Sequence, residues 1–147
     1  MTHEEKAKAL FCEGYNCSQA VLGAFCEELG LPFDTAMKLA SSFGGGMGRM
    51  REVCGACSGM FMVAGLLYGY SSPETGAPKA ELYSRIRELA DRFREENGSI
   101  VCRELLEGAT VGGTPEARTE HYYKKRPCGD YVGCAAAILE EYIRTHQ

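Results

Sequence analysis

The sequence predicts an all-α protein, an irregular bundle of about five to seven helices. Apolar residues recur at helical spacing along most of the chain. Glycines and helix-capping residues separate these apolar segments, and no segment shows the sustained alternation of a half-buried strand. A chain of 147 residues can bury a substantial core as one domain. We therefore expect residues 1–147 to form a single helical domain.

The first two helices have recognisable starts and ends. Thr2 can cap a first helix and form a capping box with Glu5, and Gly14 is expected to end that helix. Asn16 can cap a second helix, and Gly30 is placed to stop it.

The middle of the chain contains three more expected helices. Asp34 can cap a third helix, which should end before the glycine-rich segment 44–48. A fourth helix is expected from near Val53 to Gly69. The range 79–97 carries the clearest apolar stripe and predicts a fifth helix.

The last part of the chain predicts a short helix, a loop and a final helix. Ser99 can cap the short helix, which contains Cys102 and should end at Gly108. Residues 108–119 are expected to form a loop, and the final helix should begin after Pro127.

Charge and hydropathy exclude several classes of function. The formal net charge is −4, so we expect no nucleic-acid partner, and Lys124–Arg126 is too short a basic run to change this. The uncharged stretch 53–70 is interrupted by glycines, which favours a buried helix over a membrane span. The first residues lack the basic and apolar regions of a secretion signal, and we expect a cytoplasmic protein.

Cysteine is the most unusual feature of the composition, with eight residues. In a reducing compartment such an excess indicates metal-binding, catalytic or redox-cycling thiols. Five cysteines are expected in the first turns of helices, where unpaired backbone N–H groups and the helix dipole lower a thiol's pKa: Cys17, Cys54, Cys57, Cys102 and Cys128. If these helix starts converge, the thiols form one site.

The other three cysteines are expected to behave differently. Cys26 and Cys134 lie inside predicted helices, where buried cysteines acting as small hydrophobic residues are the simpler interpretation. Cys12 lies near the end of the first predicted helix, five residues before Cys17, and could supply an auxiliary thiol.

The segment Cys54-Gly-Ala-Cys57 is a C-x-x-C motif at an expected helix start. Dithiol oxidoreductases use this spacing because the first thiol is activated and the second resolves a mixed disulfide. Cys54 and Cys57 are thus the candidate catalytic residues. The same spacing also suits two ligands of zinc or of an iron–sulfur cluster.

Two interpretations of the glycine-rich segment 44–48 remain open. It is either a tightly bent connection, with Met47 and Met50 filling the core, or a loop that closes over the thiol site. In the second case Arg49 and Arg51 are the nearest cations to pair with thiolates; in the first they are ordinary solvated charges.

Several motifs together resemble the C-GCAxxG-C-C family of redox-active proteins, and the likeness covers nearly the whole chain. They are Gly14-Tyr-Asn-Cys17-Ser-Gln-Ala, Phe43-Gly-Gly-Gly-Met-Gly-Arg, Cys54-Gly-Ala-Cys-Ser-Gly59, Cys102-Arg-Glu-Leu-Leu and Cys128. The resemblance implies that the family's four cysteines are Cys17, Cys54, Cys102 and Cys128, and that its glycines are Gly55 and Gly59. Cys57 occupies a position that the family pattern leaves open, so its role is not implied by the resemblance.

Three functions therefore remain. In the first, helix-start thiols carry out dithiol/disulfide or electron-transfer chemistry with an unidentified redox partner. In the second, the four family cysteines hold a cofactor, with Gly55 and Gly59 beside it, and ligate zinc or a small iron–sulfur cluster. In the third, the chain is a non-catalytic helical protein whose cysteines only pack. Whether the protein is an enzyme, and whether it forms a homodimer, stays open.

Overall fold

The computed structural model describes residues 1–73, 76–120, 122 and 127–146. The basic run Lys124–Arg126 lies outside these residues. The all-α prediction is confirmed: the described ranges contain helices and no named strand, and extended backbone pairs only in an isolated bridge between Val53 and Val101.

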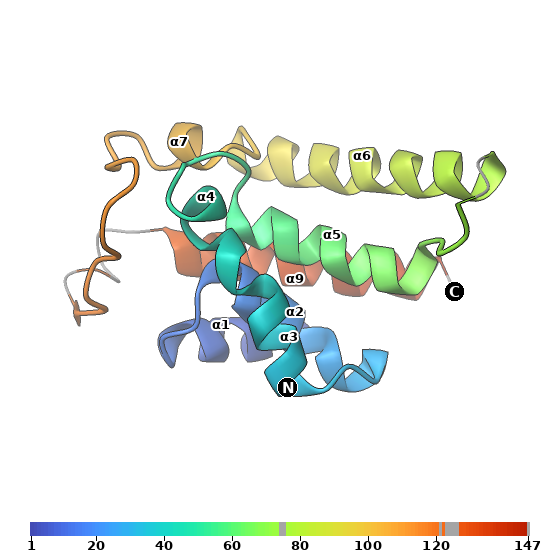
Figure 1. Ribbon diagram of the computed structural model, residues 1–147, viewed down its shortest axis with the longest axis horizontal. Coiled ribbons are helices and arrows are strands. Elements are labelled where there is room, and N and C mark those ends of the chain that lie inside the picture. The colour runs from blue at the N-terminus through green and yellow to red at the C-terminus, as the bar shows by residue number, and fades with distance from the viewer. Residues whose placement is uncertain (74–75, 121, 123–126, 147) are drawn as a thin grey trace.

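Figure 1 shows an irregular bundle in which α6 runs along α5, with α9 behind them and α1, α2 and α3 on the other side. The central helix is α2, which packs against α1, α3, α5 and α9. The elements are α1 His3–Cys12, α2 Cys17–Leu29, α3 Phe33–Ala40, the 3₁₀ turn η1 Ser41–Phe43, α4 Gly44–Met47, α5 Gly55–Tyr68, α6 Ala77–Asn97, α7 Cys102–Leu105 and α9 Cys128–Thr145.

The first two helices begin as the sequence predicts. Thr2 and Glu5 form a capping box at α1, and Asn16 forms a second capping box with Gln19 at α2. Gly30 then ends α2 in the left-handed conformation, with φ of 68°.

Two predicted caps were wrong. α3 begins at Phe33 after Pro32, so Asp34 lies inside the first turn, where its negative charge still suits the helix dipole. α7 begins after Val101, because the Ser99 hydroxyl accepts the Val101 N–H (2.9 Å) instead of one within the helix.

Large side chains from several helices fill the core. Phe11, Phe25, Phe93 and Tyr142 are all almost completely buried. Burying one such side chain stabilises the fold by about 1.5–3 kcal/mol. The helices α1, α2, α6 and α9 that carry these residues therefore hold the bundle together.

Two glycines allow α5 to approach α2 closely. A Cβ atom added at Gly59 would lie 2.8 Å from the Ser18 carbonyl oxygen and 3.0 Å from Cβ of Val21. A Cβ atom at Gly55 would lie 3.1 Å from Cβ of Cys17. All three distances are too short for an ordinary contact, so these glycines allow the start of α5 to lie against the start of α2.

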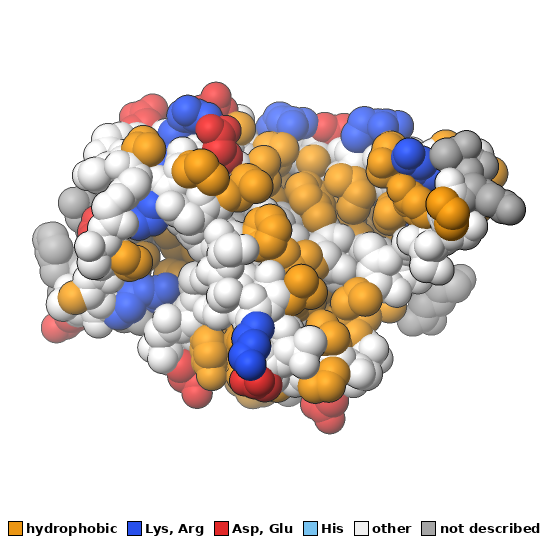
Figure 2. Space-filling model, in the orientation of Figure 1, with side chains coloured by type: hydrophobic (Ala, Val, Ile, Leu, Met, Phe, Trp, Pro, Cys, Tyr) orange, Lys and Arg blue, Asp and Glu red, His pale blue; other side chains and the backbone are white. Residues whose placement is uncertain are grey.

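The space-filling view shows apolar side chains gathered along the seam between α6 and α5 (Figure 2). Leu66, Leu67 and Tyr83 belong to the exposed apolar residues of these two helices. Met50 is also exposed (54%), so it does not fill the core as one of the two open interpretations of segment 44–48 supposed. None of the described helices combines the length and the apolar character needed to cross a membrane.

Candidate thiol site

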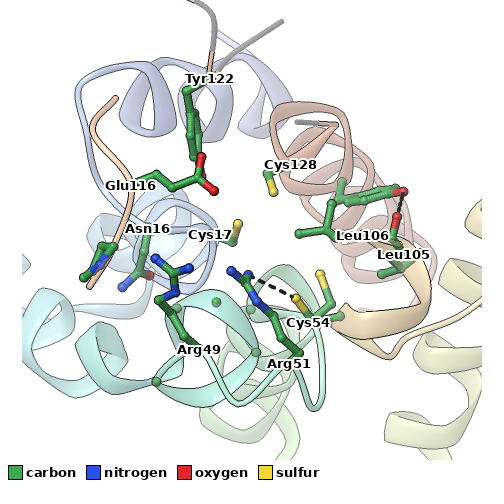
Figure 3. Close-up of a pocket in the computed structure, with 18 of the residues that line it drawn as sticks. Asn16, Cys17, Arg49, Arg51, Cys54, Leu105, Leu106, Glu116, Tyr122 and Cys128 are labelled. Carbon is green, nitrogen blue, oxygen red and sulfur yellow. Dashed lines mark hydrogen bonds between the residues drawn. The ribbon is translucent and has the colours of Figure 1, made fainter. Parts of the chain in front are cut away.

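One end of the bundle encloses a pocket of about 290 Å³. The starts of α5 and α9 lie at this end together with α4, α7 and the loop that follows α7 (Figure 1). Its wall includes all four cysteines that match the family pattern: Cys17, Cys54, Cys102 and Cys128. The structure thus brings together thiols that are far apart in the sequence (Figure 3).

Each of these cysteines occupies a helix start. Cys17, Cys102 and Cys128 are the first residues of α2, α7 and α9, and Cys54 is the N-cap of α5. Backbone N–H groups at these positions have no partner within the helix. A helix start favours negative charge, and several helix starts open on the same pocket.

Cys54 and Cys57 form one hydrogen-bonded pair of the site. The Cys57 S–H donates a hydrogen bond to the Cys54 sulfur, and this bond lowers the pKa of Cys54, aided by the N–H groups of Ala56 and Cys57 and opposed by burial. The same hydrogen bond and burial raise the pKa of Cys57. Cys54 is therefore the more acidic thiol of the pair, and Cys57 is the one that keeps its proton more strongly.

Cys17 and Cys128 form a second pair in the pocket wall. A hydrogen bond with Cys128 raises the pKa of Cys17 strongly, and burial raises it further. Cys17 is therefore held as a thiol that donates to its neighbour.

Cys102 faces a cation. Burial raises the pKa of Cys102, while a hydrogen bond from Arg51 opposes this rise. The two groups are 3.7 Å apart, from Nη1 of Arg51 to the sulfur. Arg51 was one of two cations expected near the thiols, and it is buried rather than solvated.

Backbone hydrogen bonds fix the starts of α5 and α7 relative to each other. The Cys54 N–H donates to the Ile100 carbonyl (2.7 Å), and the Cys102 N–H donates to the Glu52 carbonyl (2.6 Å). These reciprocal bonds surround the Val53–Val101 bridge. They hold Cys54 and Cys102 side by side on the pocket wall.

The glycine-rich segment forms another part of the wall, through Gly44, Gly45, Gly46 and Gly48. Gly46 has a left-handed φ of 71°, and a Cβ atom there would lie 2.7 Å from Cβ of Cys102. Only glycine fits this position without displacement. Segment 44–48 therefore lies against the thiol site. This agrees with the second of the two open interpretations, in which the segment closes over that site.

The loop after α7 forms another part of the pocket wall and is held in place by Arg118. Arg118 donates to the carbonyls of Phe11 (3.1 Å) and Tyr15 (2.9 Å), which ties the loop to α1. Arg118 and Tyr131 both line the pocket, and neither was among the predicted site residues. No local pattern marks either residue, because their partners lie far away in the sequence.

The remaining predicted residues lie outside the pocket lining. Cys57 and Gly59 are buried in α5, and Cys26 is buried in the core. Cys12 is exposed at the end of α1. The predicted burial of Cys134 was wrong: it is only half-buried, because its thiol reaches the Glu96 carboxylate at the surface (2.9 Å).

Among the residues that the structure describes, no three His, Cys, Asp or Glu side chains are gathered in an arrangement that could hold a metal ion. All eight cysteines are free of disulfides.

An all-α bundle with four helix-start thiols around one pocket defines a helical protein with a multi-thiol site. The family described as "Putative redox-active protein (C_GCAxxG_C_C)" matches residues 15–142. The chain belongs to this family, as the resemblance in its motifs implied. No curated protein and no solved structure matches the chain significantly.

Proposed function

We propose that this protein is a dithiol redox protein in which Cys54 is the nucleophile and Cys57 is the resolving thiol. The observation that carries the proposal is the placement of the pair. Cys54 lines the pocket, whereas Cys57 lies in the first turn of α5, fully buried behind it, and donates its S–H to the Cys54 sulfur. A reagent in the pocket meets Cys54 first.

The chemistry needs a disulfide as the oxidised substrate. The Cys54 thiolate attacks one substrate sulfur, the substrate S–S bond breaks, and the leaving sulfur departs as a thiolate that takes a proton from water. Cys57 then attacks the Cys54 sulfur and gives up its proton, the bond between Cys54 and the substrate breaks, and the second substrate sulfur takes that proton and leaves as a thiol. The substrate gains two electrons, and the protein gains a Cys54–Cys57 disulfide.

Local electrostatics support this division of roles. A nucleophilic thiol needs a lowered pKa, and Cys54 has one because of the Cys57 S–H and two backbone N–H groups. The resolving thiol stays protonated until the mixed disulfide forms, since the Cys54 thiolate and burial both raise its pKa.

The test is an anaerobic oxidation of the metal-free protein by a small disulfide, followed by alkylation and peptide mapping. The expected product is a Cys54–Cys57 disulfide. Before oxidation, Cys54 should alkylate faster near neutral pH than Cys26, whose pKa is raised by burial. A reduced protein in which Cys54 reacts no faster than Cys26, and which forms no Cys54–Cys57 disulfide, would contradict the proposal.

A second candidate is a metal-binding module. The observation that favours it is that Cys17, Cys54, Cys102 and Cys128 line one pocket; among the described residues these thiols are not gathered as metal ligands, so binding would have to draw them together. Four thiolates suit zinc or a small iron–sulfur cluster. Metal analysis and the visible spectrum of anaerobically purified protein test it. One equivalent of zinc, or sulfur-to-iron charge-transfer absorption, favours this candidate, and a colourless metal-free protein favours the dithiol.

The third alternative, a structural helical protein, predicts neither outcome. It requires that substitution of Cys54 or Cys57 changes stability alone. The same alkylation and metal measurements therefore distinguish all three functions.

A further inference from the structure

The charged groups in the pocket wall are mostly cations. Among the described residues, Arg49, Arg51 and Arg118 line the pocket, and Glu116 is the carboxylate that lines it with them. Arg118 is occupied by the carbonyls of Phe11 and Tyr15. The partners of the other two arginines leave part of each group without a counter-charge or a hydrogen bond.

Arg51 is buried, with 5% of its surface exposed. Its Nε donates to the Thr110 carbonyl (3.0 Å), and its Nη1 contacts the Cys102 sulfur. No carboxylate among the described residues pairs with it. A buried guanidinium without an opposite charge is unfavourable. An anion bound in the pocket would supply the counter-charge that Arg51 lacks among the described residues.

Arg49 also lacks a complete set of partners. Its Nη1 donates to the Thr114 carbonyl, whereas its Nε is buried and has no hydrogen-bond partner among the described residues. Buried polar groups are nearly always hydrogen-bonded in native proteins. The orphaned Nε is a second, independent sign that a group is missing from this wall.

Both guanidinium groups point towards the centre of the pocket, with the sulfurs of Cys17 and Cys128 across from them (Figure 3). Arg49 and Arg51 have left-handed backbone, with φ of 64° and 60°, a conformation that non-glycine residues seldom adopt. Their backbone N–H groups bond to the carbonyls of Gly44 and Gly45. An anion would therefore meet the side chains of this segment rather than these amides.

We infer that Arg49 and Arg51 form a binding site for a carboxylate beside the thiols. Guanidinium groups pair with carboxylates through parallel N–H···O bonds. The pocket, at about 290 Å³, suits a small molecule. The inference rests on the proposed function and names its class of substrate. The disulfide that Cys54 attacks is a small molecule that carries carboxylates.

The test compares three small disulfides that differ in charge: dithiodipropionate is anionic, hydroxyethyl disulfide is neutral and cystamine is cationic. The rate of mixed-disulfide formation at Cys54 is measured for the metal-free wild type and for Arg49→Gln, Arg51→Met and Arg103→Met. Arg103 is the matched control, because it is an exposed arginine that pairs with Glu52 outside the pocket lining.

We expect the wild type and Arg103→Met to react with the anionic disulfide at least about tenfold faster than with the neutral one. Arg49→Gln and Arg51→Met should lose this preference. Arg49 is only partly buried, so Arg49→Gln keeps the test available if Arg51→Met fails to fold. Equal rates for all three disulfides on the wild type would overturn the carboxylate site and leave the dithiol function intact.

A binding measurement separates the two proposals. Succinate is titrated into the reduced protein by calorimetry, with Arg49→Gln and Arg103→Met as variants. Saturable binding that Arg49→Gln weakens about tenfold or more, while Arg103→Met retains it, supports the site even if no disulfide reacts with Cys54. Absence of succinate binding to the wild type overturns the site.

Discussion

Nη1 of Arg51 lies 3.7 Å from the sulfur of Cys102, and this contact joins the glycine-rich side of the pocket to the first residue of α7. The two residues are 51 positions apart in the chain. The guanidinium lowers the pKa of Cys102 against burial, which is the stronger influence and raises it.

Replacement of Arg51 by methionine should therefore raise the pKa of Cys102 further in the metal-free protein. The thiolate loses its nearest cation, while its burial is unchanged. Site-resolved alkylation against pH measures the shift, and Cys102 should react more slowly at a given pH. Arg103→Met serves as the control because Arg103 pairs with Glu52. An unchanged Cys102 titration in Arg51→Met would show that the contact has no electrostatic effect.

Replacement of Cys57 by alanine should raise the pKa of Cys54, since the Cys57 S–H is the largest influence that lowers it. Cys57→Ser keeps a donor at the same position and should retain most of the effect. Alkylation of Cys54 in the metal-free protein at neutral pH measures both variants. If both variants react as fast as the wild type, the helix start alone activates Cys54.

Gly59→Ala should destabilise the fold by about 1–3 kcal/mol, because the new methyl group overpacks the contact between α5 and α2. Its Cβ would lie 2.8 Å from the Ser18 carbonyl oxygen. Gly65→Ala is the matched control in the same helix, since a Cβ at Gly65 meets no atom within 4 Å. The control should be neutral or gain up to about 1 kcal/mol from helix propensity.

Urea unfolding of the two glycine variants checks this difference. Equal stability of Gly59→Ala and Gly65→Ala would mean that α5 can move away from α2 at no cost.

Cys134 should make the fold less stable at alkaline pH. Burial, together with a hydrogen bond to Glu96, raises the pKa of Cys134 to about 12, above the ordinary thiol value of about 8.5. A raised pKa contributes stability that is present below the unfolded value and is lost as the pH rises towards the folded value. The loss therefore falls between about pH 8.5 and about pH 12.

Urea unfolding at about pH 7 and about pH 10.5 tests this window. Cys134→Ala should lose less stability between the two pH values than the wild type does. Glu96→Gln should give a smaller version of the same change, because the carboxylate is one cause of the raised pKa. Identical losses in the wild type and Cys134→Ala would contradict the assignment.

Local sequence patterns predicted the helices well because their signals are local. The capping boxes at Thr2 and Asn16 and the stop at Gly30 each depend on residues within one turn. The predicted caps at Asp34 and Ser99 were wrong for equally local reasons. Pro32 takes the N-cap position of α3, and the Ser99 hydroxyl accepts the N–H of Val101, which is itself the N-cap of α7.

The sequence by itself determined that five cysteines would occupy helix starts, since a helix start is specified by neighbours along the chain. Only the tertiary structure decided that four of them line one pocket, that Arg51 is buried against Cys102 and that Arg118 ties the covering loop to α1. These relationships join residues far apart in the chain, and they depend on how closely α5 can approach α2 at Gly55 and Gly59. Packing between helices, which no local pattern records, assembles the site.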